Sequence, residues 1–421
     1  MIQRLSSILA PHYRWSYYDL KYLFLVTLLI LDFIIIRSPN LVFRLVIGML
    51  MISAMMIPYI RQFAIPALPI FTWLITFYAC QFIPLDYRPT HIFVNILPTL
   101  ERILYGASLS EIISRHTHPV LDILAWIPYG VMHFSFPFVL ALILFIFGPP
   151  GALDIFSQSF GYMNIAGVLT QLLFPNASPW YEMSYGSAPA DYSIPGEAGG
   201  LVRIDKILGL NLYGSTFGNS PLVFGAFPSL HSGSATIEML FLVYLFPRLW
   251  PIGVAYTMWL WWCTMYLTHH YLIDLVGGSI YAFLTYFVAR QFLPRVDHTK
   301  STRLGYLGIE KASFMSFVYS LEHQKTALQP PDDEEALLKR QEYSSVHDPQ
   351  AEPITNDVRI PPLRLRRSDS PTATIYDDDN YLSSPVSLTS GVSSFSNSEP
   401  NSPMSPRSPV TLPQLPFGTK C

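Results

Sequence analysis

Long apolar runs limit what this chain can fold into more strongly than any other feature of its sequence. Eight of them are close to the length of about twenty residues that a helix needs to cross the hydrocarbon layer of a bilayer. The runs cover residues 21–37, 41–60, 64–84, 124–148, 153–175, 233–247, 250–268 and 271–293, and the sixth is short unless it begins near Ser229. Prolines interrupt several runs, so the count is approximate. The pattern predicts an all-α, polytopic bundle with about eight membrane-spanning helices.

The composition agrees with a membrane protein. Hydrophobic residues make up 51% of the 421 residues and charged residues only 13%, whereas about 25% charged is usual in soluble proteins. The net charge of −3 gives no indication of a nucleic-acid partner. The three cysteines are far apart and two lie in apolar runs, so neither a disulfide framework nor a zinc site is expected. No cluster of carboxylates resembles a magnesium site either, and we expect no metal and no cofactor.

The chain divides into three parts, which are a short N-terminus (residues 1–20), a membrane domain (21–298) and a tail (299–421). The tail is rich in Ser, Pro and Asp, and its composition cannot bury enough apolar surface to fold, so we expect it to be disordered. Basic residues flank the membrane domain at both ends. An even number of spans puts both ends on one side, which the positive charge marks as cytosolic.

This orientation places three segments between the spans on the lumenal or outer side of the membrane. Segment 86–118 carries apolar residues at helical spacing, which predicts an amphipathic helix at the interface. Segment 176–232 is rich in Gly, Pro, Ser and Tyr, and we expect a long loop there. The turn 268–271 is the third of these segments.

The first stretch with chemical potential is Gly225–Gly233, where small polar residues and His231 open a membrane helix. A helix N-terminus presents free N–H groups and a positive dipole end, which suit an anion such as phosphate. Ser229, Ser232 and the backbone amides are candidates to hold phosphoryl oxygens while His231 handles a proton. The alternative is an ordinary helix cap made by Ser229 or Ser232, with an incidental histidine.

The second stretch, His269–Asp274, opens the last apolar run. His270 and Asp274 are four residues apart, so on a helix they lie on one face, where the carboxylate fixes the tautomer of the imidazole and makes its other nitrogen a better nucleophile. An ionisable residue within a membrane span is a functional candidate by default. The alternative is a structural ion pair or a cation site. We rank His269 well below His270, because it points to a different face of a helix.

Topology connects the two stretches. The sixth run begins just after His231 and the eighth begins at His270, and these two spans run in the same direction. Both histidines therefore lie at one face of the membrane whatever its orientation, which favours a joint catalytic role for His231, His270 and Asp274.

The motifs Pro228-Ser229-Leu230-His231 and His270-x-x-x-Asp274 resemble the second and third motifs of the type 2 phosphatidic acid phosphatase superfamily, which implies its six-helix catalytic core. Over roughly residues 15–295 the sequence is similar to fungal inositol phosphorylceramide synthases. The stretches that carry this similarity are the two motifs and residues 98–106, 126–147, 161–164 and 200–209.

The chain also departs from the superfamily pattern. Leu230 stands where glycine is usual, Cys263-Thr264 stand where Ser-Arg is usual, and no lysine lies seven residues before an Arg-Pro pair. The usual cationic phosphate clamp is therefore missing. Our candidates to replace it are Arg203 and Lys206, and more weakly Arg102, although all three are equally well interpreted as interfacial anchors for lipid headgroups.

The resemblance implies transfer of phosphoinositol from phosphatidylinositol to the primary hydroxyl of ceramide, through a phosphohistidine on His270 and with His231 as acid and base. It also implies a fungal Golgi membrane enzyme with a lumenal active site, sensitive to cyclic depsipeptide antibiotics. The need for a small regulatory membrane subunit is left open. The alternatives are a lipid phosphatase, a proton-coupled transporter and a lipid-binding scaffold.

Overall fold

A computed structural model of the chain describes residues 20–309, 313, 315–316 and 320–321. Within these residues the secondary structure is helical, apart from two isolated β-bridges that join Asn176 to Phe93 and to Gly225. The longer helices are α2 (Leu20–Ile35), α3 (Leu41–Met56), α4 (Pro58–Ala79), α8 (His133–Phe147), α9 (Ala152–Leu173), α13 (Leu230–Leu245), α14 (Trp250–Tyr266) and α15 (Leu272–Ala289). The shorter elements are η2 (Cys80–Phe82), η3 (Leu85–Tyr87), α5 (Ile96–Tyr105), α6 (Leu109–Ser114), α7 (Pro119–Trp126), η4 (Ile127–Met132), α10 (Pro179–Tyr185), α11 (Leu201–Leu208), α12 (Leu212–Gly218), η5 (Pro247–Leu249) and α16 (Arg303–Tyr306).

Every apolar run that the sequence analysis singled out forms a helix, so the all-α prediction is confirmed. Three continuous helices within the described residues are long and apolar enough to cross a membrane, and they cover Tyr59–Phe82, Pro119–Phe147 and Leu272–Ala289. Helices α3 and α13 are apolar but shorter. The number of eight spans therefore stays a prediction.

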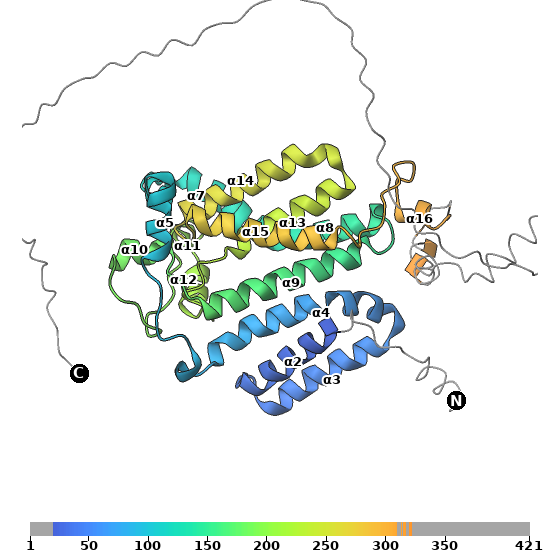
Figure 1. Ribbon diagram of the computed structural model, residues 1–421, viewed down its shortest axis with the longest axis horizontal. Coiled ribbons are helices and arrows are strands. Elements are labelled where there is room, and N and C mark those ends of the chain that lie inside the picture. The colour runs from blue at the N-terminus through green and yellow to red at the C-terminus, as the bar shows by residue number, and fades with distance from the viewer. Residues whose placement is uncertain (1–19, 310–312, 314, 317–319, 322–421) are drawn as a thin grey trace, which may run out of the picture. The chain divides into compact units, whose positions relative to one another are not determined.

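Helix α4 lies between α9 on one side and the α2–α3 pair on the other (Figure 1). It can approach α9 closely because Gly161 of α9 has no side chain; a Cβ there would lie 2.5 Å from the backbone of Pro69 and Ile70. Helix α13 is the centre of the second half of the bundle and contacts α8, α9, α14 and α15.

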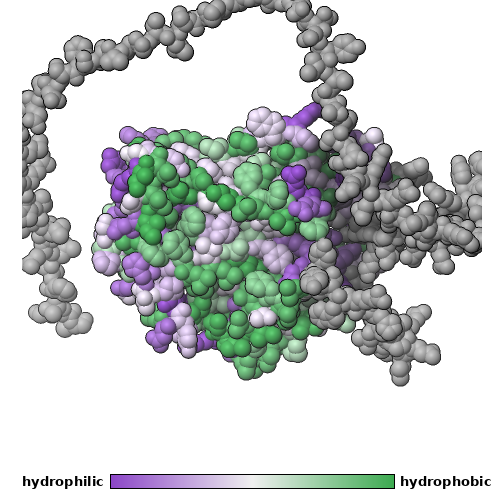
Figure 2. All heavy atoms as spheres, viewed as in Figure 1, coloured by the Kyte–Doolittle hydropathy of each residue, from purple (hydrophilic) through white to green (hydrophobic). Residues whose placement is uncertain are grey.

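The surface of the bundle is apolar over long stretches, and green hydrophobic residues cover much of the face seen in Figure 2. Large apolar side chains such as Val42 on α3, Phe138 on α8 and Leu284 on α15 are more than half exposed. A soluble monomer rarely exposes apolar patches of this extent. The surface therefore fits a bundle surrounded by lipid chains.

The short helices α5, α7, α10, α11 and α12 gather at one end of the bundle (Figure 1). The prediction of a loop in 176–232 was wrong in part, since this segment contains α10, α11 and α12. The carboxylate of Asp205, on α11, accepts backbone N–H groups from Leu212, Tyr213 and Gly214 at 2.9–3.1 Å. Burial raises the pKa of Asp205, but these three hydrogen bonds outweigh it and hold the pKa below its usual value.

The predicted N-terminal and tail domains fall largely outside the described residues, which exclude 1–19 and all residues after 321. Within the range assigned to the tail, the structure describes helix α16. The guanidinium group of its Arg303 is buried over the ring of Phe145, 4.9 Å from the ring centroid. The part of the chain that packs on the bundle therefore continues past residue 298.

Candidate active site

Helix α13 places His231 at its second residue. The hydroxyl of Ser229 accepts the N–H of Ser232 at 3.3 Å, which caps the helix and makes it begin at Leu230. The backbone N–H of Ser229 also donates to the carbonyl of Asp274 at 3.0 Å, so the starts of α13 and α15 are joined directly.

A close contact between α13 and α15 brings the two motifs together. A Cβ on Gly278 of α15 would lie 2.0 Å from the carbonyl oxygen of Ser229, and one on Gly277 would lie 2.4 Å from the ring of Phe227. Only glycine permits this approach, because any other residue would push the helices apart near their N-termini.

His270 lies in the turn before α15, and Asp274 lies in the first turn of that helix. The Oδ2 atom of Asp274 accepts the backbone N–H of Tyr271 at 2.9 Å and lies 3.2 Å from Nδ1 of His270. The other ring nitrogen of His270, Nε2, is 3.3 Å from Nδ1 of His231. The structure thus brings the three residues proposed as catalytic into one chain of contacts, with Asp274 fully buried (0% exposed) behind His270.

A cavity of about 620 Å³, here called the catalytic cavity, opens onto these histidines. Its polar end includes His133, His231, His269 and His270. The remainder is mostly apolar, with aromatic and aliphatic side chains from α4, α8 and α9 such as Trp73, Phe77, Phe134, Pro137, Phe138 and Phe160. A cluster of polar side chains in an otherwise apolar cavity suits a lipid substrate with a polar headgroup.

Comparisons with known proteins place this site in a family. A model of the PAP2 superfamily matches residues 97–288, a range that contains all four histidines. The chain is 50% identical over 294 residues to the inositol phosphorylceramide synthase catalytic subunit of Schizosaccharomyces pombe, covering 70% of this chain and 69% of the relative. The inositol phosphorylceramide synthase of Candida albicans is 45% identical over 78% of this chain and 70% of its own length. The Saccharomyces cerevisiae catalytic subunit is 47% identical over 69% and 72%.

The chain belongs to the inositol phosphorylceramide synthase family. The family resemblance expected from the histidine motifs is confirmed. No solved structure matches the chain.

Two further histidines, His133 and His269, line the catalytic cavity beside the predicted pair, and neither was among the residues predicted to be catalytic. His133 begins α8 directly after the π-helical turn η4, and its ring centroid lies 4.5 Å from that of His231. His269 precedes α15 instead of lying on it, so the argument from helix faces did not apply to it. The available signal for His133 was an ionisable residue inside an apolar run.

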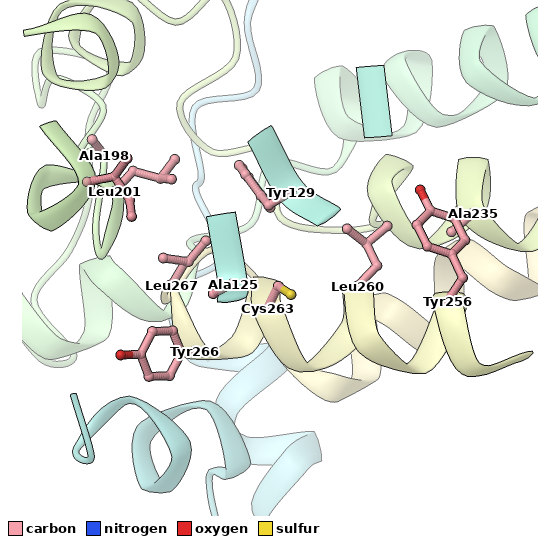
Figure 3. Packing of buried hydrophobic residues seen from close by; sticks show 11 residues of the cluster. Ala125, Tyr129, Ala198, Leu201, Ala235, Tyr256, Leu260, Cys263, Tyr266 and Leu267 are labelled. Atoms are coloured by element: carbon pink, nitrogen blue, oxygen red, sulfur yellow. The ribbon is translucent and has the colours of Figure 1, made fainter. Parts of the chain in front are cut away.

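Tyr129, on η4, holds two of the histidines in place. Its ring stacks on His231 at 4.6 Å and on His269 at 5.3 Å between centroids. Figure 3 shows Tyr129 among the apolar residues that surround it, with Leu267 at the end of α14 and Ala198 and Leu201 from the segment around α11. The π-helical turn that aims Tyr129 and His133 at the site is typical of functional positions.

The two serines proposed as phosphate ligands have other contacts in the synthase fold. Ser229 caps α13, and the hydroxyl of Ser232 donates to the carbonyl of Leu275 at 2.6 Å and lies 2.9 Å from Ser279. Both serines are fully buried and neither lines the catalytic cavity, whereas Ser234 does. The structure therefore favours the alternative reading of these two hydroxyls as parts of a helix cap and a helix–helix contact.

The three proposed phosphate-binding cations are not brought to the catalytic cavity. Arg203 forms an ion pair with Asp122 at 2.7 Å and stacks on Tyr266. Arg102 pairs with Glu182, and Lys206 is exposed on α11. Sequence spacing did not reveal the acidic partners, because Asp122 and Glu182 are about eighty residues away from the arginines they bind.

Helix α5 braces the turn that carries His270. Glu182, the partner of Arg102, accepts the hydroxyl of Tyr271 at 2.9 Å. Glu101 accepts the backbone N–H of Leu272 at 2.8 Å, and burial raises the pKa of its carboxyl group. Arg102 and Glu101 therefore support the position of His270 from outside the cavity.

Proposed function

We propose that this chain transfers phosphoinositol from phosphatidylinositol to the primary hydroxyl of ceramide, which yields inositol phosphorylceramide and diacylglycerol. The observation that carries the proposal is the contact chain from His231 through His270 to Asp274, at the polar end of an apolar cavity. Relatives named as inositol phosphorylceramide synthases support the same reaction.

In the first step, Nε2 of His270 attacks the phosphorus of phosphatidylinositol. The bond from phosphorus to the diacylglycerol oxygen breaks, and His231 gives a proton to that oxygen, so diacylglycerol leaves. Asp274 keeps the proton of His270 on Nδ1, which leaves the electron pair of Nε2 free to react. The phosphorus is reached from the space between the two rings, so the rings separate as the phosphate enters.

In the second step, the ceramide hydroxyl attacks the phosphohistidine. His231 accepts the hydroxyl proton, the phosphorus–nitrogen bond breaks, and His270 is regenerated. Water at this stage would turn the enzyme into a phosphatase, which the largely apolar walls of the catalytic cavity oppose.

We further propose a Golgi membrane enzyme whose active site faces the lumen and whose residues 299–421 form a cytosolic tail. The basic residues at both ends of the membrane domain support this orientation. Two of the relatives are named catalytic subunits, which supports a small membrane subunit as a partner.

The test is an assay in liposomes with fluorescent ceramide and inositol-labelled phosphatidylinositol. Wild type is expected to form a labelled, ceramide-derived product, and His231→Ala, His270→Ala and Asp274→Ala are each expected to lose it by about 10²-fold or more. His116→Ala is the matched control, because His116 is exposed and does not line the catalytic cavity. Product that persists without His270 would exclude the covalent mechanism, and release of inositol phosphate without ceramide product would indicate a phosphatase.

A further inference from the structure

A second cavity of about 620 Å³, here called the headgroup cavity, adjoins the catalytic cavity. It lies among the turn after α2, the segment η2–η3, residues 192–195 and the end of α12. Ser220 and Val223 line both cavities, so the two cavities are neighbours at these residues. Ser220 is also close to the histidines of the catalytic cavity. Its N–H donates to the carbonyl of Phe217, and the ring of Phe217 lies 4.7 Å from the ring of His269.

The two cavities differ in charge. Arg37 and Arg88 are the charged side chains among the residues that line the headgroup cavity, and no Asp or Glu lines it. The catalytic cavity is lined by no Lys or Arg, and besides its histidines its charged lining residue is Glu197. The positive potential that an anionic headgroup requires is therefore found next to the reacting histidines and not among them.

Local contacts hold the side chain of Arg88 in the wall of the headgroup cavity. Its guanidinium group donates to the carbonyls of Ile83 at 3.1 Å and Cys80 at 2.8 Å. It also lies 5.1 Å from the ring centroid of Tyr192, whose hydroxyl donates to the Pro89 carbonyl. Such a planar, oriented donor group suits recognition of an oxygen-rich ligand.

We propose that the headgroup cavity holds the inositol ring of the donor lipid while the phosphorus lies between His231 and His270; this rests on the proposed function. An inositol ring presents only hydroxyl groups, and the cavity supplies polar side chains to meet them, which are Arg37, Gln81, Arg88, Tyr192, Asn219 and Ser220. Its volume falls within the range of about 300–1,000 Å³ usual for small-molecule sites.

Charge gives the cavity its selectivity. The phosphoinositol group carries one negative charge and no positive charge, whereas phosphocholine and phosphoethanolamine groups end in a cation. Two arginines repel such a cation and favour the neutral polyol with its phosphate, so discrimination between donor lipids arises from a repulsive element as well as from hydrogen bonds.

The experiment compares Arg37→Gln, Arg88→Gln and the double variant in the liposome assay. Arg115→Gln is the matched control, because Arg115 is an exposed arginine that lines neither of these cavities. The KM for phosphatidylinositol is expected to rise by about tenfold or more while the KM for ceramide stays unchanged, and the preference for phosphatidylinositol over phosphatidylethanolamine is expected to fall. An unchanged donor KM and preference in a folded Arg37→Gln variant would overturn the proposal, even if Arg88→Gln failed to fold.

A binding measurement separates this proposal from the proposed function. Soluble glycerophosphoinositol is expected to bind purified His270→Ala protein, and to bind at least about tenfold more weakly when Arg37→Gln and Arg88→Gln are added. If wild type transfers phosphoinositol but the affinity for glycerophosphoinositol is the same with and without both arginines, the proposed role of the headgroup cavity is wrong and the proposed reaction stands. If the affinity for glycerophosphoinositol falls when the arginines are replaced while wild type makes no ceramide product, the proposed role of the headgroup cavity stands and the proposed reaction is wrong.

Discussion

The carboxylate of Asp274 shows how much one buried residue does in this site. It contacts His270 and the N–H of Tyr271 through the same oxygen, and the residue is 0% exposed. A carboxylate in this position selects the histidine tautomer and stabilises the positive charge that the ring gains on attack.

Asp274→Asn is therefore expected to keep the fold but lower the transfer rate by about 10²–10⁴-fold, because an amide can present its N–H to His270 and favour the wrong tautomer. The rate is measured in the liposome assay and the fold by thermal unfolding in detergent. A variant with close to wild-type rate would show that Asp274 is structural.

For Ser232 we expect an effect on stability and not on the transfer rate, because its hydroxyl contacts Leu275, Ser279 and Trp261 inside the bundle. Ser232→Ala is expected to lower the free energy of unfolding by about 1–3 kcal/mol, because polar partners are left unsatisfied, with the KM for phosphatidylinositol unchanged. A rise in that KM without loss of stability would restore Ser232 as a phosphate ligand.

Among the elements, α13 and α15 decide whether the site exists. Each helix supplies one motif, and their separation is set by the glycines of α15 and the cap of α13. The histidine nitrogens are 3.3 Å apart only because the two helix starts are in direct contact.

Gly278→Ala is expected to lower activity by about 10²-fold, because its Cβ would overlap the Ser229 carbonyl oxygen at 2.0 Å and move His231 away from His270. Gly48→Ala on α3 is the control, since nothing lies within 4 Å of the added Cβ. Activity is compared at equal amounts of folded protein, and an active Gly278→Ala variant would contradict the geometry.

At the scale of the whole molecule, the apolar surface and the cluster of short helices at one end agree with a bundle that spans a membrane and carries its site near one face (Figures 1 and 2). In the orientation proposed above, which rests on the basic residues at both ends of the membrane domain, that face is lumenal. The orientation is open to a direct test by glycosylation.

Tyr185→Asn creates an Asn-Gly-Ser acceptor at a residue that is 44% exposed, and we expect it to be glycosylated in yeast membranes. The natural acceptor Asn176-Ala177-Ser178 is expected to stay unmodified, because Asn176 is 0% exposed and its N–H is bonded to Phe224. Glycosylation at either site is detected as an increase in apparent mass on a gel that treatment with an endoglycosidase removes. A Tyr185→Asn variant without the shift would contradict the proposed lumenal orientation.

The sequence by itself determined the helices, and it singled out the three residues that the structure brings into contact, His231, His270 and Asp274. A run of about twenty apolar residues is long enough to form a membrane-spanning helix. The motifs around His231 and His270 were recognised from the spacing of residues that are near one another in the sequence. The alternative of a helix cap at Ser229 or Ser232 was also open from the sequence, because a cap is a local signal, and the structure shows that Ser229 makes it.

Only the tertiary structure decided which partners the polar residues have. Arg203 and Arg102 form ion pairs with acidic residues that are far away in sequence. The hydroxyl of Ser232 bonds to a neighbouring helix, and the helical turn η4 directs His133 toward the site. Each of these outcomes depends on distances between elements, which no local pattern encodes. The same holds for the two cavities, because a cavity is formed by segments that meet only after the chain has folded.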